Sequence, residues 1–433
     1  MARIRGIPVS QKDHADPAWT AGMRAICGRI LCSPAILFIT GPAVQQPAGG
    51  GPVASPSTLR EPARVCLMWS VEFSVMAGAL VVLLFFHVFL FARLAFRTPT
   101  VQPDRELPIS VVICARSEAR TLEAIIPLLM QQDHKEFEVV VVNDRSEDDT
   151  WEVLQCMKPN YPRLRPVNIQ ADEKFNYGKK LALGVGVRAA KYPHVLLTDA
   201  DCLPAGREWI SSMTAGFAKG KQIVIGHSPY AYQPGLANML ERYDGTMKAM
   251  QYMAFAMGGF PYMGVGRNLG YTGELFFNAK GPQRHAQLMS GDDDLFINEV
   301  ARARNTGVVA DPRSFMTTRP TRDLGTWLRR KRRHYTTAAH YRFGHQGLLL
   351  LLPLARTVFW ALLLWFMVRG LWREALVGLV VELAVLLPIT IAAMHRLHAG
   401  LLVWLSIPLE WLFLLLDPLL YASTILVKPK RWK

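Results

Sequence analysis

The stretch His194-Val-Leu-Leu-Thr-Asp-Ala-Asp-Cys202 indicates both a fold and a candidate site. Its apolar run, residues 195–197, is typical of a short buried strand, and two carboxylates, Asp199 and Asp201, follow it. In an open α/β sheet, ligands bind in the crevice at the carboxyl ends of the strands. Two carboxylates on one turn suit a hard divalent ion, Mg²⁺ or Mn²⁺, that substrate phosphates also hold. Because most Asp-x-Asp pairs are solvated turn residues, this hypothesis depends on the rest of the chain.

The composition indicates a membrane protein. Of the 433 residues, 51% are hydrophobic and 19% are charged, and the net charge is +15. In a membrane protein such an excess lies mostly in cytoplasmic loops, beside anionic lipid. Nucleic acid is the other usual partner of a basic chain, but the basic cluster lies just before an apolar run, so we expect no nucleic-acid binding. The six cysteines form no Cys-x-x-Cys pair and no zinc-type spacing, which favours a reducing compartment.

Apolar segments flank a more polar central region. Residues 75–96 are a predicted transmembrane helix of the length that a bilayer requires, and Arg93 and Arg97 place its end in the cytoplasm. Residues 348–427 are a predicted C-terminal transmembrane region with spans at 348–368 and 375–394. Its last stretch, 400–426, contains prolines and carboxylates and is either a third span or a re-entrant or interfacial segment. The basic tail behind it prefers the cytoplasm, which a third span would not allow if the central region is cytoplasmic.

The first 67 residues differ from the rest of the chain. Residues 41–57 are rich in Pro, Gly, Ala and Gln and have no periodicity, which is typical of disorder. Met68 stands directly before the first apolar run. Residues 1–67 are therefore predicted to be either a disordered extension or a wrongly assigned one, with translation starting at Met68.

Residues 105–320 alternate between strand and helix patterns. We expect strands at 109–114, 138–142, 195–197 and 222–226, with helices between them and a long helix at 236–257. Repeated strand–helix units of this kind predict an α/β domain, with a mostly parallel sheet covered by helices on both faces.

Three further stretches carry candidate site residues. Residues 258–273 are dense in glycine, which lets a backbone approach a ligand closely. Ser290-Gly-Asp-Asp-Asp-Leu-Phe296 opens a predicted helix that reaches about residue 304, and its adjacent carboxylates repel one another unless a positive group binds them. Residues 324–345 are a predicted basic amphipathic helix at the membrane interface. Its basic run, 329–333, can reach lipid headgroups or a bound anion.

Taken in order, these segments resemble the membrane-attached inverting glycosyltransferases of family 2, over roughly residues 108–341. The segments that carry the resemblance are Pro108-Ile-Ser-Val-Val-Ile-Cys-Ala-Arg-Ser-Glu118, Val142-Asn-Asp-Arg-Ser-Glu-Asp-Asp-Thr150, Gly178-Lys-Lys180, Thr198-Asp-Ala-Asp-Cys202, Gly266-Arg-Asn268, Ser290-Gly-Asp-Asp-Asp-Leu295 and Arg330-Lys-Arg-Arg-His334. The resemblance implies a GT-A fold, a Rossmann-like nucleotide-diphospho-sugar transferase domain, between transmembrane helices. It also implies a catalytic domain on the cytoplasmic side of an inner or plasma membrane.

The resemblance assigns roles to the matching residues. Residues that hold the donor nucleotide would be Ala115, Arg116, Glu118, Asp144, Lys179 and Lys180. The metal ligands, for Mg²⁺ or Mn²⁺, would be Asp199 and Asp201. Residues that contact the diphosphate or the acceptor would be Arg267, Asn268, Arg330, Arg333 and His334. The catalytic base would be Asp292, with Asp293 as the neighbouring candidate.

The implied reaction moves a sugar from a UDP- or GDP-sugar to a hydroxyl of a lipid or lipid-linked glycan, with inversion. Negative charge grows on the leaving diphosphate, and a metal at Asp199 and Asp201 would stabilise it. Asp292, whose acidic neighbours raise its proton affinity, would take the proton of the attacking hydroxyl.

Three alternatives compete with this interpretation. A processive polysaccharide synthase would extrude polymer through its own spans. The family's Gln-x-x-Arg-Trp motif has Arg330 and His334 here and keeps only Arg333, which argues against it. A GT-A nucleotidyltransferase would make a sugar nucleotide, and the membrane spans and the acidic motif disfavour it. A non-catalytic membrane scaffold that keeps the fold would not need the site carboxylates that this chain retains.

Overall fold

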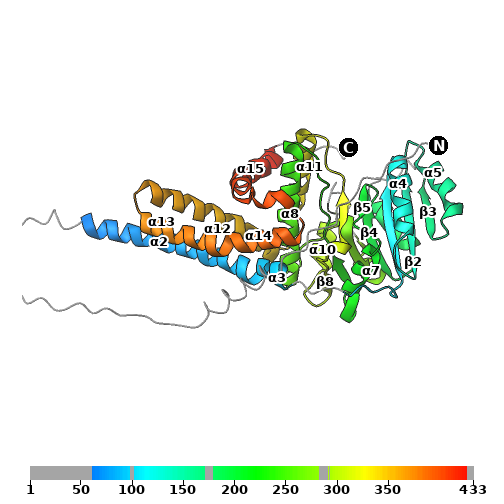
Figure 1. Ribbon diagram of the computed structural model, residues 1–433, viewed down its shortest axis with the longest axis horizontal. Coiled ribbons are helices and arrows are strands. Elements are labelled where there is room, and N and C mark those ends of the chain that lie inside the picture. The colour runs from blue at the N-terminus through cyan, green and yellow to red at the C-terminus, as the bar shows by residue number, and fades with distance from the viewer. Residues whose placement is uncertain (1–60, 98–101, 171–178, 282–290, 292, 427–433) are drawn as a thin grey trace, which may run out of the picture. The chain divides into compact units, whose positions relative to one another are not determined.

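A seven-stranded sheet organises the central part of the chain, in the strand order β3-β2-β1-β4-β7-β6-β8 (Figure 1). The computed structural model describes residues 61–97, 102–170, 179–281, 291 and 293–426. The strands of this sheet are β1 (Ile109–Ala115), β2 (Phe137–Asp144), β3 (Leu164–Ile169), β4 (His194–Asp199), β6 (Ile223–Ile225), β7 (Leu269–Thr272) and β8 (Thr306–Val308). A small antiparallel pair, β5 (Cys202–Pro204) and β9 (Met316–Thr318), lies beyond the end of β4.

The sheet is mostly parallel, as predicted, with β7 as the one antiparallel strand among the seven. Strands β3, β2, β1 and β4 are parallel, as the strand–helix alternation predicts, but β7 pairs antiparallel with both β4 and β6. The register aligns Cys114 with Asp199 and Ala115 with Asn143. The carboxyl ends of β1, β2 and β4 therefore meet at one edge of the sheet, where an open α/β sheet binds its ligands.

The side chains of the strands contribute to two hydrophobic layers, one on each face of the sheet, because successive residues of a strand point to opposite faces. Val111 and Val139 pack against α4 (Ala119–Met130) and α7 (Trp209–Thr214). Val112 and Val140 pack on the opposite face, against α6 (Lys179–Ala189) and the long helix α8 (Leu236–Met257). The remaining helices of this region are α5 (Thr150–Met157), α9 (Gly273–Asn278) and α10 (Asp294–Val300). The predicted α/β fold is thus confirmed, with helices on both faces.

Four helices in the described part of the chain are long and apolar enough to cross a membrane, judged by length and composition. The first runs through α2 (Glu61–Leu84), a π-helical segment (Phe85–Phe91) and α3 (Ala92–Phe96). The second is α12 (Phe343–Val368). The third joins α13 (Trp372–Val381), a π-helical segment (Glu382–Leu386) and α14 (Leu387–Arg396), and the fourth is α15 (Ser406–Leu426). These helices support the predicted association with a membrane.

The first apolar helix is anchored in the α/β domain. Phe86 stacks on Phe255 of α8 with ring centroids 5.6 Å apart. Arg93 donates a hydrogen bond from Nη1 to the carbonyl oxygen of Met257, at 3.1 Å. Phe86 and Leu90 belong to the same buried cluster as α8 residues and α14 residues. The domain and the membrane helices therefore share a core.

Some element ends differ from the sequence-based expectation. The basic helix α11 (Leu324–Ala338) ends before residue 345, because α12 begins at Phe343. Helix α10 ends at Val300 rather than near 304. Of the predicted N-terminal extension, residues 1–60 lie outside the described part, and α2 covers residues 61–67.

Candidate active site

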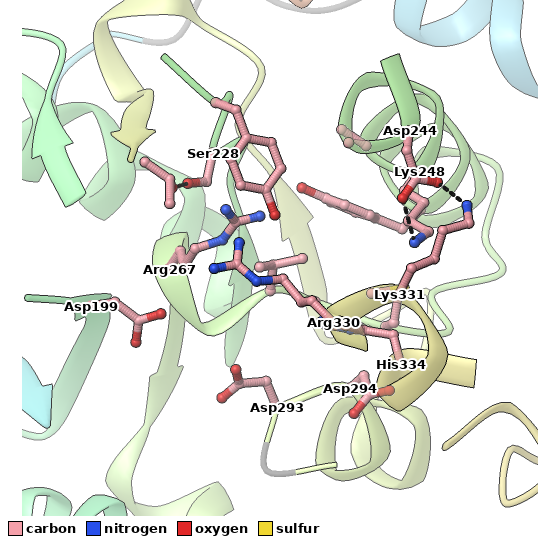
Figure 2. Close-up of a pocket in the computed structure, with 18 of the residues that line it drawn as sticks. Asp199, Ser228, Asp244, Lys248, Arg267, Asp293, Asp294, Arg330, Lys331 and His334 are labelled. Carbon is pink, nitrogen blue, oxygen red and sulfur yellow. Dashed lines mark hydrogen bonds and ion pairs between the residues drawn. The ribbon is translucent and has the colours of Figure 1, made fainter. Parts of the chain in front are cut away.

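A cavity of about 280 Å³ opens at the carboxyl end of β4, between the sheet, α8 and α11 (Figure 2). Its lining includes acidic groups from the β4 end and from the start of α10, and basic groups from the 266–268 turn and α11. Segments more than 130 residues apart in the sequence thus contribute to one space, as the resemblance predicts. The predicted residues that line the cavity are Lys179, Asp199, Asp201, Arg267, Asp293, Arg330, Arg333 and His334.

The acidic side of the cavity is built by the turn after β4. Asp199 accepts a hydrogen bond from the Lys179 ammonium at 2.8 Å. Burial raises the pKa of Asp199, but the ion pair with Lys179 and the charges of Arg267 and Arg330 outweigh it and lower the pKa below its usual value. Asp199 is therefore anionic at neutral pH. Asp201 also lines the cavity.

The opposite wall carries two guanidinium groups, those of Arg267 and Arg330, which point toward each other in the cavity (Figure 2). Arg267 lies over the Tyr230 ring at 4.5 Å, and within the described residues its Nη1 atom has no hydrogen-bond partner. Arg330 is paired with Glu241 of α8 at 3.1 Å. Two neighbouring cations repel each other unless an anion lies between them. This wall therefore has the chemistry of a phosphate or diphosphate site.

The carboxylate of Asp293 lies on the acidic side of the same space (Figure 2). Its Oδ2 accepts a hydrogen bond from the backbone N–H of Gly266 at 2.9 Å. A Cβ atom at position 266 would lie 2.1 Å from this oxygen, so glycine is the residue that allows the approach. Asp292, the predicted base, lies outside the described residues. Of the two candidates, the structure describes Asp293.

Asp294 ties the start of α10 to the basic helix α11. Its Oδ2 accepts hydrogen bonds from the hydroxyls of Thr337, at 2.6 Å, and Tyr341, at 2.8 Å. Asp293 and Asp294 therefore lie in different environments. Asp293 is held by a backbone N–H, and Asp294 by two hydroxyls from the segment that follows the cavity arginines.

The orientation of α11 depends on a buried lysine, Lys331, that was not among the predicted site residues. Lys331 is 2% exposed and forms ion pairs with Asp244 of α8, at 2.6 Å, and Asp417 of α15, at 2.9 Å. Asp244 also pairs with Lys248, at 3.0 Å. Burial raises the pKa of Asp244, but the two lysines outweigh it and lower the pKa to about 2. With Lys331 fixed inward, its neighbours Arg330 and His334 face the cavity.

Helix α8 was predicted as a long helix without site residues, yet it supplies a polar face to the cavity. Glu241, Asp244 and Lys248 all line it. Their spacing of three and four residues places them on one side of a helix, and that spacing is the signal in the sequence that would have found them.

Of the residues predicted to hold the donor nucleotide, Lys179 lines this cavity. The others lie along the same edge of the sheet, outside the described lining. Asp144 is buried at the end of β2 and accepts a hydrogen bond from Arg145 Nε at 2.9 Å. The loops after β1 and β2 are joined, since the Ser117 N–H donates to Ser146 Oγ at 2.9 Å. Ala115 ends β1, and Arg116 and Glu118 follow in the first of these loops; Lys180 follows Lys179 in α6.

Asn268 does not line the cavity as described. Its Nδ2 donates to the carbonyl oxygens of His227, at 2.8 Å, and Ser314, at 2.7 Å, and its Oδ1 accepts from Trp209 Nε1 at 3.0 Å. The side chain is fully buried. These bonds fix the turn that carries Arg267, so a positioning role fits Asn268 better than the predicted contact with diphosphate or acceptor.

Comparison with known proteins identifies the domain. Residues 110–265 match the family model described as Glycosyl transferase family 2. The chain contains a family 2 glycosyltransferase domain. The predicted family is thus confirmed, and the match runs from the second residue of β1, Ser110, to Val265, just before the turn at 266–268.

Curated relatives of the glycosyltransferase domain are similar over part of their length only. The chain is 27% identical over 107 residues to poly-beta-1,6-N-acetyl-D-glucosamine synthase of Staphylococcus aureus (strain COL), covering 25% of each protein. It is 29% identical over 93 residues to the synthase of that name from Staphylococcus epidermidis (strain ATCC 35984), covering 22% of this chain and 21% of the relative. The match therefore spans about a quarter of these relatives.

A solved structure shares the fold over most of the chain. The mannosyltransferase PcManGT from Pyrobaculum calidifontis, in complex with GDP-Man and Mn²⁺, aligns with 83% of this chain and 99% of its own, at a TM-score of 0.53 and 18% identity. At this identity the comparison supports the GT-A fold of the glycosyltransferase domain.

The carboxylates of this glycosyltransferase domain fit a divalent cation. Asp199 and Asp201 provide oxygen ligands on one turn that faces the cavity, which suits Mg²⁺ or Mn²⁺. Among the described residues, no further His, Cys, Asp or Glu completes a group of three around a metal position. The remaining ligands would thus come from water and substrate phosphate, as is usual for Mg²⁺.

Proposed function

We propose that the protein is a membrane-bound glycosyltransferase that moves a sugar from a nucleoside-diphospho-sugar to a hydroxyl of a lipid or lipid-linked acceptor, with inversion. The observation that carries this proposal is the arrangement of one cavity. Two carboxylates for a cation, two arginines for an anion and a further carboxylate, Asp293, face the same space.

In the proposed reaction the arginines bind the diphosphate. Arg267 and Arg330 would hold its oxygens, and Lys179 would contribute a third positive charge from α6. Negative charge grows on these oxygens as the glycosidic C–O bond breaks, so donors placed there stabilise the transition state more than the ground state. A divalent ion on Asp199 and Asp201 would supply further positive charge to the leaving group.

The proposed base is the carboxylate at the start of α10. Asp293 would accept the proton of the attacking hydroxyl, while the hydrogen bond from the Gly266 N–H to its Oδ2 holds the carboxylate in place. Attack on the face opposite the leaving diphosphate inverts the anomeric carbon. Asp292 remains the alternative base, and Asp144 the proposed contact to the nucleotide base.

The acceptor is proposed from the surroundings of the cavity. Helix α11 lines it and carries five consecutive basic residues, 329–333, and α12 begins five residues after α11 ends. A lipid-linked acceptor would reach the cavity from a membrane on this side, which we propose to be cytoplasmic. The poly-beta-1,6-N-acetyl-D-glucosamine synthases that the chain resembles leave a processive synthase as the second candidate.

The test is donor hydrolysis by the purified full chain in detergent, with UDP- and GDP-sugars and with Mn²⁺ or Mg²⁺. We expect nucleoside diphosphate release from one donor, and its loss in Asp201→Ala. Asp293→Asn should abolish transfer, whereas Asp292→Asn should retain it; the reverse pattern would make Asp292 the base. Binding and turnover of no donor would contradict the proposal. With lipid acceptor present, products of many sugars would favour a processive synthase instead.

A further inference from the structure

We propose that α15 does not cross the membrane but lies along its surface, with a stripe of leucines in one leaflet. By length and composition α15 is a candidate span, although the least apolar of the four. Its contacts, described below, place it beside the basic helix α11. This inference concerns the membrane surface and does not depend on the proposed sugar transfer.

Helices α11 and α15 run side by side in the same direction. The Trp327 and Phe413 ring centroids are 6.1 Å apart. One turn further along both helices, Lys331 is paired with Asp417 at 2.9 Å.

The contact continues by another turn in each helix. The ring centroids of Tyr335 and Tyr421 are 6.1 Å apart, and Arg332 donates to the carbonyl oxygen of Ser423 at 2.9 Å. The three side-chain pairs, Trp327–Phe413, Lys331–Asp417 and Tyr335–Tyr421, advance by four residues in each helix from one to the next. Residues 413–421 of α15 therefore share the depth of residues 327–335 of α11.

The charge of α11 sets that depth. Residues 329–333 are all Arg or Lys, and a charged side chain near the bilayer centre costs several kcal/mol, on the order of 3 kcal/mol for each by insertion scales. On its other side α11 faces the polar cavity, through Arg330 and His334. A helix with these neighbours lies at the membrane surface, and α15, in contact with it over two turns, lies there too.

The two faces of α15 agree with this placement. Its exposed leucines follow one another at steps of three, four and seven residues and form a single stripe: Leu412, Leu415, Leu419 and Leu426. Leu415 and Leu419 are each 69% exposed, and Leu426 is 83% exposed. The opposite face carries Glu410 and Asp417, seven residues apart, which pair with Arg356 and Lys331. A helix that lies along a membrane can place such a leucine stripe in the lipid while its paired carboxylates face protein.

In the fold, α15 is also set apart from the long apolar helices. In Figure 1, α2, α12 and α13 run lengthwise along the picture, whereas α15 is drawn as a compact coil at the end of that bundle nearest α8 and α11. The N-terminal half of α15 is fixed to the bundle and to α8: Glu410 and Glu382 both pair with Arg356 of α12, Trp411 packs on Trp360 of α12, and Phe413 packs on Tyr243 of α8. Further along, Asp417, Tyr421 and Ser423 contact α11.

A surface position of α15 determines on which side of the membrane the chain ends. The chain would cross the membrane three times, through α2–α3, α12 and α13–α14, and the end of α15 would lie on the same side as the glycosyltransferase domain. The basic residues after α15, Lys428, Lys430, Arg431 and Lys433, would then share that side, as the positive-inside rule favours.

The first test is the depth of the leucine stripe in lipid. Spin labels at Leu412→Cys and Leu426→Cys, in the full chain without native cysteines and in phosphatidylglycerol-containing nanodiscs, report collision with oxygen and with a water-soluble reagent. Leu350 and Leu364, both exposed on α12, are the matched control pair, since 14 residues of a spanning helix change depth by about 21 Å. We expect a depth change along α15 of less than half that of the control pair.

An equal depth change in both pairs would show that α15 spans and would overturn the inference. Labels on α15 that neither reagent reaches would also overturn it, because another protein surface would then cover the stripe.

The second test needs no replacement of core cysteines. A membrane-impermeant maleimide is applied to sealed vesicles of known orientation, with a cysteine added after Lys433 and, separately, at Arg373→Cys in the first turn of the third span. Native Cys156, which is exposed in the glycosyltransferase domain, reports the side of that domain. We expect the added C-terminal cysteine to react from the same side as Cys156, and Arg373→Cys from the opposite side. Reaction of the C-terminal cysteine from the side opposite Cys156 would contradict the inference.

Discussion

Replacing Gly266 with alanine should displace Asp293 and slow sugar transfer. A Cβ at position 266 would lie 2.1 Å from Asp293 Oδ2, whereas real contacts of this kind keep at least 3.0 Å, so the oxygen must move by 0.9 Å (3.0 − 2.1). The same movement breaks the 2.9 Å hydrogen bond from the Gly266 N–H. Misplacing a reacting group by about 1 Å costs on the order of 10²-fold in rate, which is about 2.7 kcal/mol of transition-state stabilisation.

The assay compares transfer rate and nucleotide binding in Gly266→Ala and in the wild-type chain. Because Gly266 has no positive φ, alanine strains no backbone there, and we expect the rate to fall by about 10²-fold with nucleoside diphosphate binding unchanged. Gly184→Ala is the matched control, since its Cβ would meet nothing within 4 Å. A folded Gly266→Ala protein that transfers sugar at the wild-type rate would refute the role of Asp293.

Three further predictions concern the supports of the site. Lys331→Met keeps the bulk of the side chain but leaves Asp244 and Asp417 without this partner. The free energy of unfolding, followed by thermal unfolding in detergent, should therefore fall by about 3–5 kcal/mol. An unchanged melting temperature would contradict the buried ion pairs. Because the folded-state pKa of Asp244 is lowered to about 2, its contribution of about 2 kcal/mol is present above the ordinary pKa near 4 and is lost as pH falls toward 2. Asp244→Asn should therefore be less stable at pH 6 and lose less stability than the wild type between pH 4 and pH 2. Burial raises the pKa of the Cys202 thiol to about 12, so at pH 8 iodoacetamide should modify exposed Cys156 and spare Cys202 until the chain unfolds; equal labelling, read by peptide mass spectrometry, would count against the described core.

The parts of the site that follow a strand could be predicted from the sequence. Asp144 and Asp199 end apolar runs, and parallel strands bring such ends to one edge of the sheet. The same logic fails for β7, whose residues lie in a glycine-dense stretch and pair antiparallel with β4. Glycine-rich segments give no clear alternation, so the register of β7 depends on tertiary contacts that no local pattern encodes.

The supports of the site were harder to predict. Lys331 stands in a run of five basic residues, and nothing local distinguishes it from its neighbours. It is buried because Asp244 and Asp417, 87 and 86 residues away, come from two other helices. For the stretch that holds α15 the sequence left a third span and an interfacial segment open, and the contacts with α11 are what favour the interfacial placement. Long-range pairing of charges is therefore what the sequence analysis lacked.

The central claim is that one cavity binds a divalent ion and a diphosphate together. Equilibrium binding of UDP and of GDP to the purified full chain, with and without Mn²⁺, tests it most directly in the wild type and in Asp201→Ala. We predict that Mn²⁺ tightens binding of one of the two nucleotides at least tenfold, about 1.4 kcal/mol, in the wild type and not in Asp201→Ala. Binding that is the same with and without Mn²⁺ in both proteins, or no binding of either nucleotide, would contradict the claim.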